Sequence, residues 1–120
     1  MERRPFDVFS ADCPSRVAWE HVTGRWGALV LGALVDGPLR FGALRRAVGG
    51  VSDRMLSQTL GHLERDGLVH REDHGTNPPH VEYSLTEPGR EVASRVLALV
   101  DTIHGVMPTV MAARSGATRG

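Results

Sequence analysis

VSDRMLSQTLGHLERDGLVHRE, residues 51–72, has the pattern of a short amphipathic helix that leads into a turn and a strand. Leu56, Leu60 and Leu63 recur at the spacing that places side chains on one face of a helix. The opposite face is polar and rich in hydrogen-bond donors: Arg54, Ser57, Gln58, Gly61, His62 and Arg65. Such a helix fits a DNA major groove, and it fits equally well the solvated surface of any small domain.

Capping residues mark both ends of this helix. Ser52 is a natural N-cap, because its hydroxyl accepts a hydrogen bond from a free amide of the first turn. Asp53 adds negative charge where the helix dipole favours it. Gly67 is suited to the left-handed position that follows the end of a helix. We therefore predict a helix from Ser52 to Asp66, about 20 Å long.

The whole chain has 120 residues, a formal net charge of zero and a single cysteine. This length fits one domain with its own hydrophobic core. Zero net charge argues against a general polyanion binder, so a nucleic-acid surface must be a local patch. One cysteine excludes an internal disulfide and suits a reducing compartment. The sequence has no apolar run typical of a signal peptide or a membrane span, so we expect a cytoplasmic protein without membrane contact.

Hydrophobic spacing predicts further helices before this segment. A first helix begins near Pro14 and ends at Thr23, and a central helix from Arg25 to Val35 is apolar nearly all round and should be buried. Residues 39–41 are a short strand or an extended link, and 41–48 have the spacing of a third helix. Two short helices joined by a few Gly-containing residues, the second with a polar outer face, form a helix-turn-helix pattern.

A β-hairpin is predicted after the helix-turn-helix. Residues 68–72 and 81–85 have the composition of strands, and the loop between them, DHGTNPPH, is rich in turn-forming residues. Thr86 is suited to cap a final helix. The expected fold class is therefore mainly α with a small β-hairpin, a winged helix-turn-helix domain with additional N- and C-terminal helices.

Several separate blocks of this sequence, taken in order, resemble the HxlR-type winged helix-turn-helix regulators of bacteria, in the MarR-like superfamily. The blocks are Cys13-Pro14, Gly24-x-Trp26, Arg40-Phe41, Met55-Leu-Ser-Gln58, Glu64-x-Asp66-Gly-Leu68 and Val81-Glu-Tyr-Ser-Leu-Thr86-x-x-Gly89. The resemblance implies a single domain over 1–120 and a homodimeric transcriptional repressor that binds double-stranded DNA. It divides the chain into an N-terminal arm (1–14), the helix-turn-helix and wing (39–85), a dimerisation helix (86–112) and a frayed tail (113–120).

The resemblance also implies how DNA would be bound, with affinity from phosphates and specificity from base edges. The residues predicted to contact base edges are Arg54, Ser57, Gln58 and Thr59. Those predicted to contact the DNA backbone are Arg40, Ser52, His62, Arg71 and His80. A two-fold dimer would bind half-sites about one helical turn apart, which predicts an inverted-repeat operator. Thr59, Gly61 and His80 stand where relatives often carry long basic residues, which suggests either weaker and more salt-sensitive binding or a different operator.

The predicted final helix carries an apolar stripe that is too wide for one small domain to cover. The residues expected at a dimer interface are Val92, Val96, Leu99, Val100, Ile103 and Met107. The resemblance implies that this helix pairs with the arm and first helix of a partner chain. The alternative is that the stripe packs wholly on its own domain.

Cys13 is the candidate for a regulatory switch. Several HxlR-type regulators sense oxidants or electrophiles through a cysteine at this Cys-Pro site, and a thiol at a helix N-terminus has a lowered pKa. The alternative is that Cys13 is a small hydrophobe kept for packing.

Other functions have weaker support in the sequence. His70, His74 and His80 cluster in the predicted wing, but their spacing is no recognisable metal-ligand pattern, so we expect no metal site and no cofactor. No phosphate-binding loop, nucleophile elbow or zinc-protease motif is present, so we expect no enzyme activity. The remaining alternatives are a winged-helix protein-interaction module and a regulator that responds to a small molecule without redox sensing.

Overall fold

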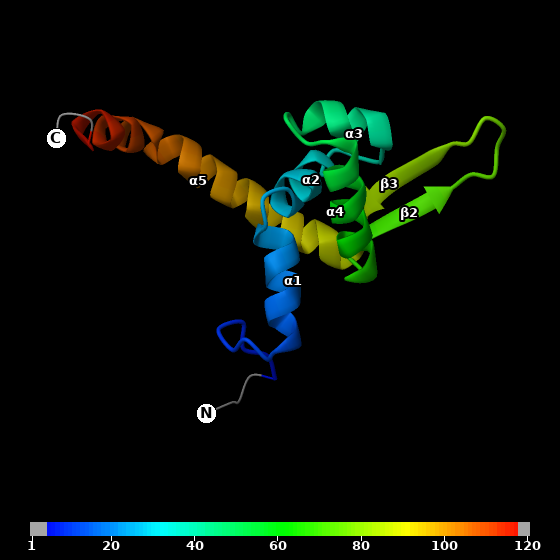
Figure 1. Cartoon of the computed structure of the whole chain (residues 1–120), viewed down its shortest axis with the longest axis horizontal. Coiled ribbons are helices and arrows are strands. Elements are labelled where there is room, and N and C mark those ends of the chain that lie inside the picture. The colour runs from blue at the N-terminus through cyan, green and yellow to red at the C-terminus, as the bar shows by residue number, and fades with distance from the viewer. Residues whose placement is uncertain (1–4, 118–120) are drawn as a thin grey trace.

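The computed structural model describes residues 5–117, which form five helices and a small antiparallel sheet (Figure 1). The helices are α1 (Pro14–Thr23), α2 (Gly27–Ala33), α3 (Phe41–Ala47), α4 (Asp53–Arg65) and α5 (Glu87–Ala117). The strands are β1 (Leu39–Arg40), β2 (Val69–Asp73) and β3 (Val81–Leu85). The predicted fold class, mainly helical with one hairpin, is confirmed.

The hydrophobic core lies where α2, α3 and α4 meet the sheet and the first turns of α5. Its buried members are Val30, Leu31, Leu34, Leu44, Val48, Val51, Leu56, Leu60, Leu63, Val69, Leu85 and Ala93. The central helix is shorter than predicted and is not buried all round, because Leu29 and Val35 are exposed. Burial of Val30 and Leu31 still makes α2 the centre of the core, as its composition predicts.

Both predicted caps of α4 are present. The Met55 amide donates a hydrogen bond to Oγ of Ser52 at 3.1 Å, and Gly67 follows the helix with a φ of +77°. This positive φ is open to glycine at little steric cost, so the chain turns sharply into β2. Leu56 and Leu63 are fully buried, which confirms the apolar face predicted for this helix.

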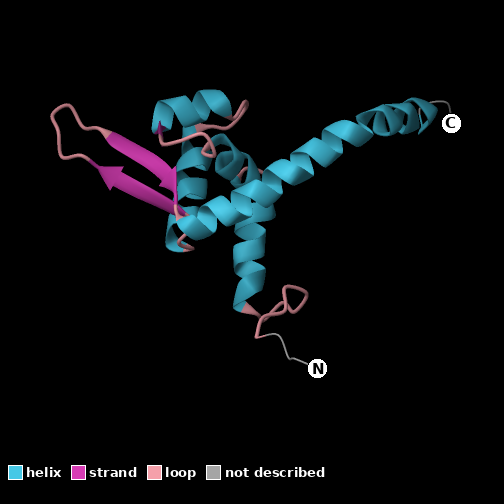
Figure 2. Cartoon of the chain, turned by 180° about the vertical axis from the view of Figure 1, so that it is seen from behind, coloured by secondary structure: helices cyan, strands magenta, loops and turns pink. Residues whose placement is uncertain are grey.

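The sheet has the strand order β1-β3-β2, with both pairs antiparallel. In the hairpin, Val69 faces Leu85 and Asp73 faces Val81, so its base packs in the core. The other end of the hairpin projects beyond the helices and carries the connecting loop at its tip (Figure 2). β2 and β3 therefore form the predicted wing.

Helix α5 begins as predicted and ends later. The Gly89 amide donates to Oγ1 of Thr86 at 3.1 Å, and the Thr86 hydroxyl donates to the Gly67 carbonyl at 2.6 Å. The predicted boundary at residue 112 is wrong, because the helix continues to Ala117. Ala112, Ala113 and Arg114 are strong helix formers, so local propensity carries the helix onward. Residues 1–4 of the predicted arm and 118–120 of the predicted tail lie outside the described residues.

Two helical glycines have opposite surroundings. A Cβ atom at Gly89 would collide with the carbonyl oxygen of Leu68, so glycine at this position lets α5 approach the start of the wing. A Cβ atom at Gly61 would meet only the flexible guanidinium of Arg65, at 3.4 Å. The same substitution should therefore have opposite effects at the two positions.

We predict that Gly61→Ala raises the free energy of unfolding by about 0.5–1 kcal/mol, the cost of glycine within a helix. Gly89→Ala should lower it by about 1–3 kcal/mol, because backbone must move to relieve the overlap. Urea denaturation followed by circular dichroism measures both. Equal effects of the two substitutions would contradict the packing described at Gly89.

Candidate nucleic-acid interface

The polar face of α4 is open to solvent. Arg54, Ser57 and Gln58 are exposed on the side of the helix opposite its buried leucines, as predicted. Ser52 is also exposed, although its hydroxyl oxygen accepts the capping hydrogen bond. The helix therefore presents one arginine and one amide, with two hydroxyl groups, from its first two turns.

Thr59 does not belong to this face, and the prediction that it contacts base edges is wrong. Its side chain is only 9% exposed and lies on the core side of α4. The reason is its spacing, three residues after Leu56 and four before Leu63, which places it between the leucines. A threonine at this position packs as a small aliphatic side chain.

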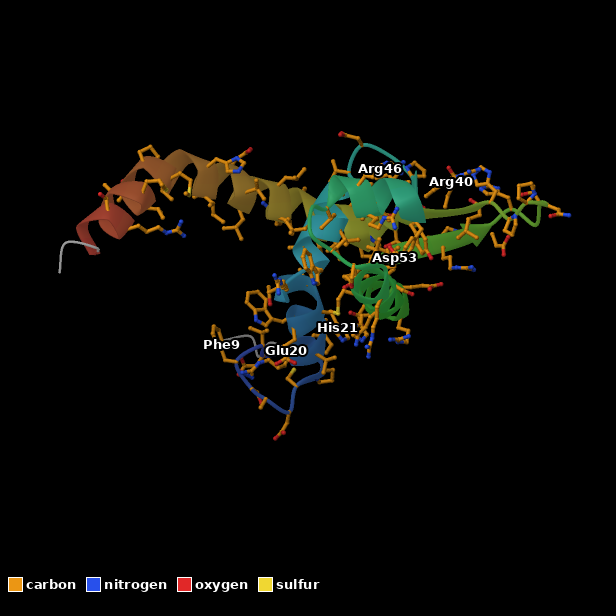
Figure 3. All side chains as sticks on the ribbon, turned by 45° about the horizontal axis from the view of Figure 1, so that its top comes forward. Phe9, Glu20, His21, Arg40, Arg46 and Asp53 are labelled. Carbon is orange, nitrogen blue, oxygen red and sulfur yellow. The ribbon has the colours of Figure 1, made fainter. Side chains whose placement is uncertain are left out.

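An ion pair joins the two helices of the helix-turn-helix. Nη1 of Arg45 on α3 lies 3.0 Å from Oδ1 of Asp53 at the start of α4. Both side chains are largely exposed, so the pair adds little to stability, but it ties the first turn of α4 to α3. Arg40 precedes α3 and Arg46 lies in its last turn, and both are exposed (Figure 3). Sequence reasoning missed Arg46, although an exposed arginine beside the turn was a usable signal.

Helix α1 packs against the other end of α4 through two histidines. The rings of His21 and His62 stack at 4.3 Å between centroids, and Nδ1 of His21 lies 2.7 Å from Oδ2 of Asp66. Figure 3 shows His21 on the side of α1 that faces α4. His62, a predicted backbone contact, is thus half-buried against α1. The sequence did not indicate this contact, because its partners are 45 residues apart.

The wing offers one free arginine and a cluster of titratable groups. Arg71 is exposed on β2, as predicted for a phosphate contact. His80, a predicted backbone contact, is half-buried, and its Nε2 lies 3.7 Å from Oε1 of Glu82. Nε2 of His74 donates to the same Glu82 oxygen at 2.9 Å, and this hydrogen bond lowers the pKa of Glu82.

Cys13 occupies the N-cap position of α1, as predicted, and is half-buried. Its sulfur accepts hydrogen bonds from the Ser15 hydroxyl and from the Asp7 amide, each at 3.2 Å. These bonds, the Ser15 bond above all, hold the pKa of the Cys13 thiol below its ordinary value. More of the thiol is therefore ionised near neutral pH than in a free cysteine, which raises its reactivity.

Much of the apolar stripe on α5 is open to solvent. Leu99 is 59% exposed and Ile103 is 46% exposed, whereas Val92, Val96, Val100 and Met107 are half-buried. The alternative that this stripe packs wholly on its own domain is therefore wrong for the described residues. Figure 1 shows the second half of α5 extending away from the other helices, which explains why the stripe lacks cover.

The apolar surface continues from α5 onto α1 and the arm. Val17, Trp19 and Phe9 are exposed there, and a groove of about 450 Å³ lies between α1 and α5. Sequence reasoning did not name these residues, because α1 is too short to show a clear stripe. By length and composition alone, α5 also passes as a possible membrane span, which the sequence analysis did not expect.

Comparison with protein families gives one match over most of the chain. The model described as "HxlR-like helix-turn-helix" matches residues 21–111. The uncharacterized HTH-type transcriptional regulator YtfH of Escherichia coli (strain K12) is 50% identical over 108 residues, which are 90% of this chain and 86% of the relative. The resemblance stated from the sequence is confirmed.

Solved structures agree with this match. A transcriptional regulator named YtfH from Salmonella typhimurium has a TM-score of 0.85 at 50% identity, over 92% of this chain and 98% of its own. The redox regulator HypR in its oxidized form has a TM-score of 0.71 at 38% identity, over 78% of this chain and 96% of its own. These relatives are regulators rather than enzymes.

Proposed function

Because the chain belongs to the HxlR-like helix-turn-helix family of transcriptional regulators, we propose that it is a cytoplasmic, dimeric repressor that binds an inverted-repeat operator. The observation that carries the proposal is the open polar face of α4, with Arg54, Ser57 and Gln58 exposed along it. A helix held by its apolar side and bare on the other is the element that enters a major groove.

Specificity would come from the first two turns of α4. The amide of Gln58 matches the donor and acceptor of adenine, and the guanidinium of Arg54 matches the two acceptors of guanine. Ser57 lies between them and is able to bond either base edge or phosphate. Thr59 has no part in this contact, since it faces the core.

Affinity would come from cations around α4. Arg40 precedes α3, Arg46 lies in its last turn and Arg71 lies on the wing, and all three are exposed. The Arg45 charge is balanced by Asp53, and the whole chain is neutral. Each chain would therefore neutralise few phosphates, so its affinity for DNA should be modest. Discrimination between sequences would then depend on the base contacts.

The dimer follows from the uncovered apolar stripe. Leu99 and Ile103 on α5, with Trp19 on α1, form exposed apolar surface that a second copy of this chain would bury. To bind half-sites one helical turn apart, a two-fold axis through this interface would have to place the two α4 helices on one side of the assembly. Covering this stripe with protein also explains why an apolar α5 belongs to a soluble regulator.

Cys13 is the proposed sensor of oxidants. Its lowered pKa and its place at the start of α1 suit a reactive thiol. Similarity to HypR, a structure described as a redox regulator in its oxidized form, supports the same role. Oxidation removes two electrons and two protons from a pair of thiols, either Cys13 of both chains or Cys13 and a small thiol, and the oxidant accepts them.

Two alternatives remain distinguishable. A winged-helix protein-interaction module would enrich no sequence from a pool of random DNA. The zero net charge of the chain is the feature that favours this alternative. A regulator that responds to a small molecule would keep operator binding without any effect of Cys13. The apolar groove between α1 and α5 is the place where such a ligand would compete with a second chain.

Selection of bound sequences from random DNA tests the proposal and supplies the operator. We predict that Gln58→Ala relaxes the preference at one base pair, at a cost of about 1–3 kcal/mol there. Arg71→Ala is the matched control on the wing. It should lower the affinity for operator DNA and for random DNA by the same factor, because a phosphate contact carries no sequence information. Equal losses on both DNAs for Gln58→Ala would show that this residue does not contact bases.

The dimer is tested by the mass of the protein in solution. Light scattering at micromolar concentration should give twice the mass of one chain. Ile103→Glu should give a monomer, because it places a charge within the proposed apolar interface. Ser94→Glu, on the opposite side of α5, should leave the dimer intact. A monomeric wild type would remove the dimer from the proposal.

The redox role is tested with hydrogen peroxide. We predict that treatment changes operator affinity several-fold, that dithiothreitol reverses the change, and that Cys13→Ser abolishes it. Because the pKa of Cys13 is lowered, its reaction should reach full rate at a lower pH than that of free cysteine. Ser15→Ala removes the largest cause of this shift and should move the profile to higher pH. A full oxidant response in Cys13→Ser would end the redox interpretation.

A further inference from the structure

The hairpin brings three metal-binding side chains to one face of the wing. The His74 amide donates to the His80 carbonyl at 2.9 Å, which extends the register in which Glu72 faces Glu82. Side chains two residues apart along a strand share a face, so His80 and Glu82 lie beside His74. One ligand atom of each of these three residues lies within 4.8 Å of the other two.

The distances within this cluster fit a single ion. Oε1 of Glu82 lies 2.9 Å from Nε2 of His74 and 3.7 Å from Nε2 of His80. Zinc at its usual distance of about 2.0–2.1 Å from nitrogen and oxygen holds its tetrahedral ligands about 3.4 Å apart. The two distances to Glu82 bracket this value, and all three ligand atoms lie within 4.8 Å of one another, so small side-chain rotations would bring them around one metal.

Two features of the cluster are unfavourable in the absence of a cation. Nε2 of His80 is shielded from solvent and makes no hydrogen bond with any described residue, although buried polar atoms are normally paired. Glu72 lies directly opposite Glu82 across the two strands, and facing like charges destabilise a sheet. A bound cation would satisfy the nitrogen and offset the repulsion.

We propose that His74, His80 and Glu82 bind one divalent transition-metal ion, with zinc as the ion that fits best. Two imidazoles and one carboxylate are a common three-ligand set for zinc, and they leave a fourth position open to solvent. The sequence does not predict this site, because the spacing of the three residues matches no familiar metal-binding motif. The ligands come together only through strand pairing.

A metal at this position would also act on DNA binding, a consequence that rests on the proposed function. It replaces the negative charge of Glu82 on the wing with a net positive charge, and its open position is able to accept a phosphate oxygen. The cation would thus add one backbone contact on the wing, which also carries Arg71 on β2.

Titration of the full chain with zinc chloride, in the absence of DNA, tests the site. Isothermal calorimetry should give one ion per chain, and His74→Gln and Glu82→Gln should each weaken binding at least tenfold. His70→Gln is the matched control, because His70 is exposed on β2 but faces Ser84. His62→Gln controls for the histidine pair between α1 and α4. Both control variants should bind within twofold of the wild type.

Circular dichroism should show that all four variants fold, since none of the four side chains belongs to the hydrophobic core. Absence of saturable zinc binding in the wild type would overturn the proposal. So would retention of binding in both His74→Gln and Glu82→Gln, or a loss in His70→Gln or His62→Gln equal to theirs.

Operator affinity with and without zinc tests the consequence separately. Zinc should tighten binding several-fold in the wild type and leave His74→Gln unchanged. Zinc binding without any change in operator affinity would overturn the link to DNA. Failure to bind DNA under either condition would contradict the proposed function and not the metal site, because the calorimetric titration contains no DNA.

Discussion

Burial of one side of α4 is the constraint on which the rest of this molecule depends. Leu56, Leu60 and Leu63 are buried in the core, so the orientation of the helix about its own axis is fixed. The Ser52 cap and the turn at Gly67 fix its two ends. With rotation and length both set, the outward residues are set as well. The same leucines that stabilise the domain therefore determine which side chains a DNA duplex would meet.

This compact core leaves α5 with more apolar surface than one chain is able to cover. Ala93 near its start is fully buried, whereas Leu99, Ile103 and Val106 farther along are exposed. The first turns of α5 belong to the domain, and the remainder has surface that only another molecule would bury. Stability of the domain and the proposed dimerisation would thus depend on different parts of one helix.

Local signals in the sequence predicted most of the fold, and long-range contacts account for what it missed. The caps of α4, the proline at the start of α1 and the turn-rich loop of the wing each act within a few residues, so they are visible in sequence. The burial of Thr59 could not be predicted, because the sequence does not show how wide the buried face of α4 is. The His21–Asp66 contact and the pairing of His74 with His80 arise only when distant segments meet.

The position of α1 suggests how an event at Cys13 would reach the DNA-binding helix. Cys13 occupies the N-cap position of α1, and His21 in the last turn of α1 contacts Asp66 and stacks on His62 near the end of α4. A helix of ten residues is about 15 Å long and transmits displacement as a nearly rigid rod. A disulfide at Cys13 would displace the first turn of α1. The last turn of α1 would then shift against the stacked rings of His21 and His62. Because the α4 cap at Ser52 and its leucines resist rotation, that displacement would change the spacing between the two α4 helices of the proposed dimer. Binding to an inverted-repeat operator depends on this spacing, because the two helices must meet half-sites at a fixed separation.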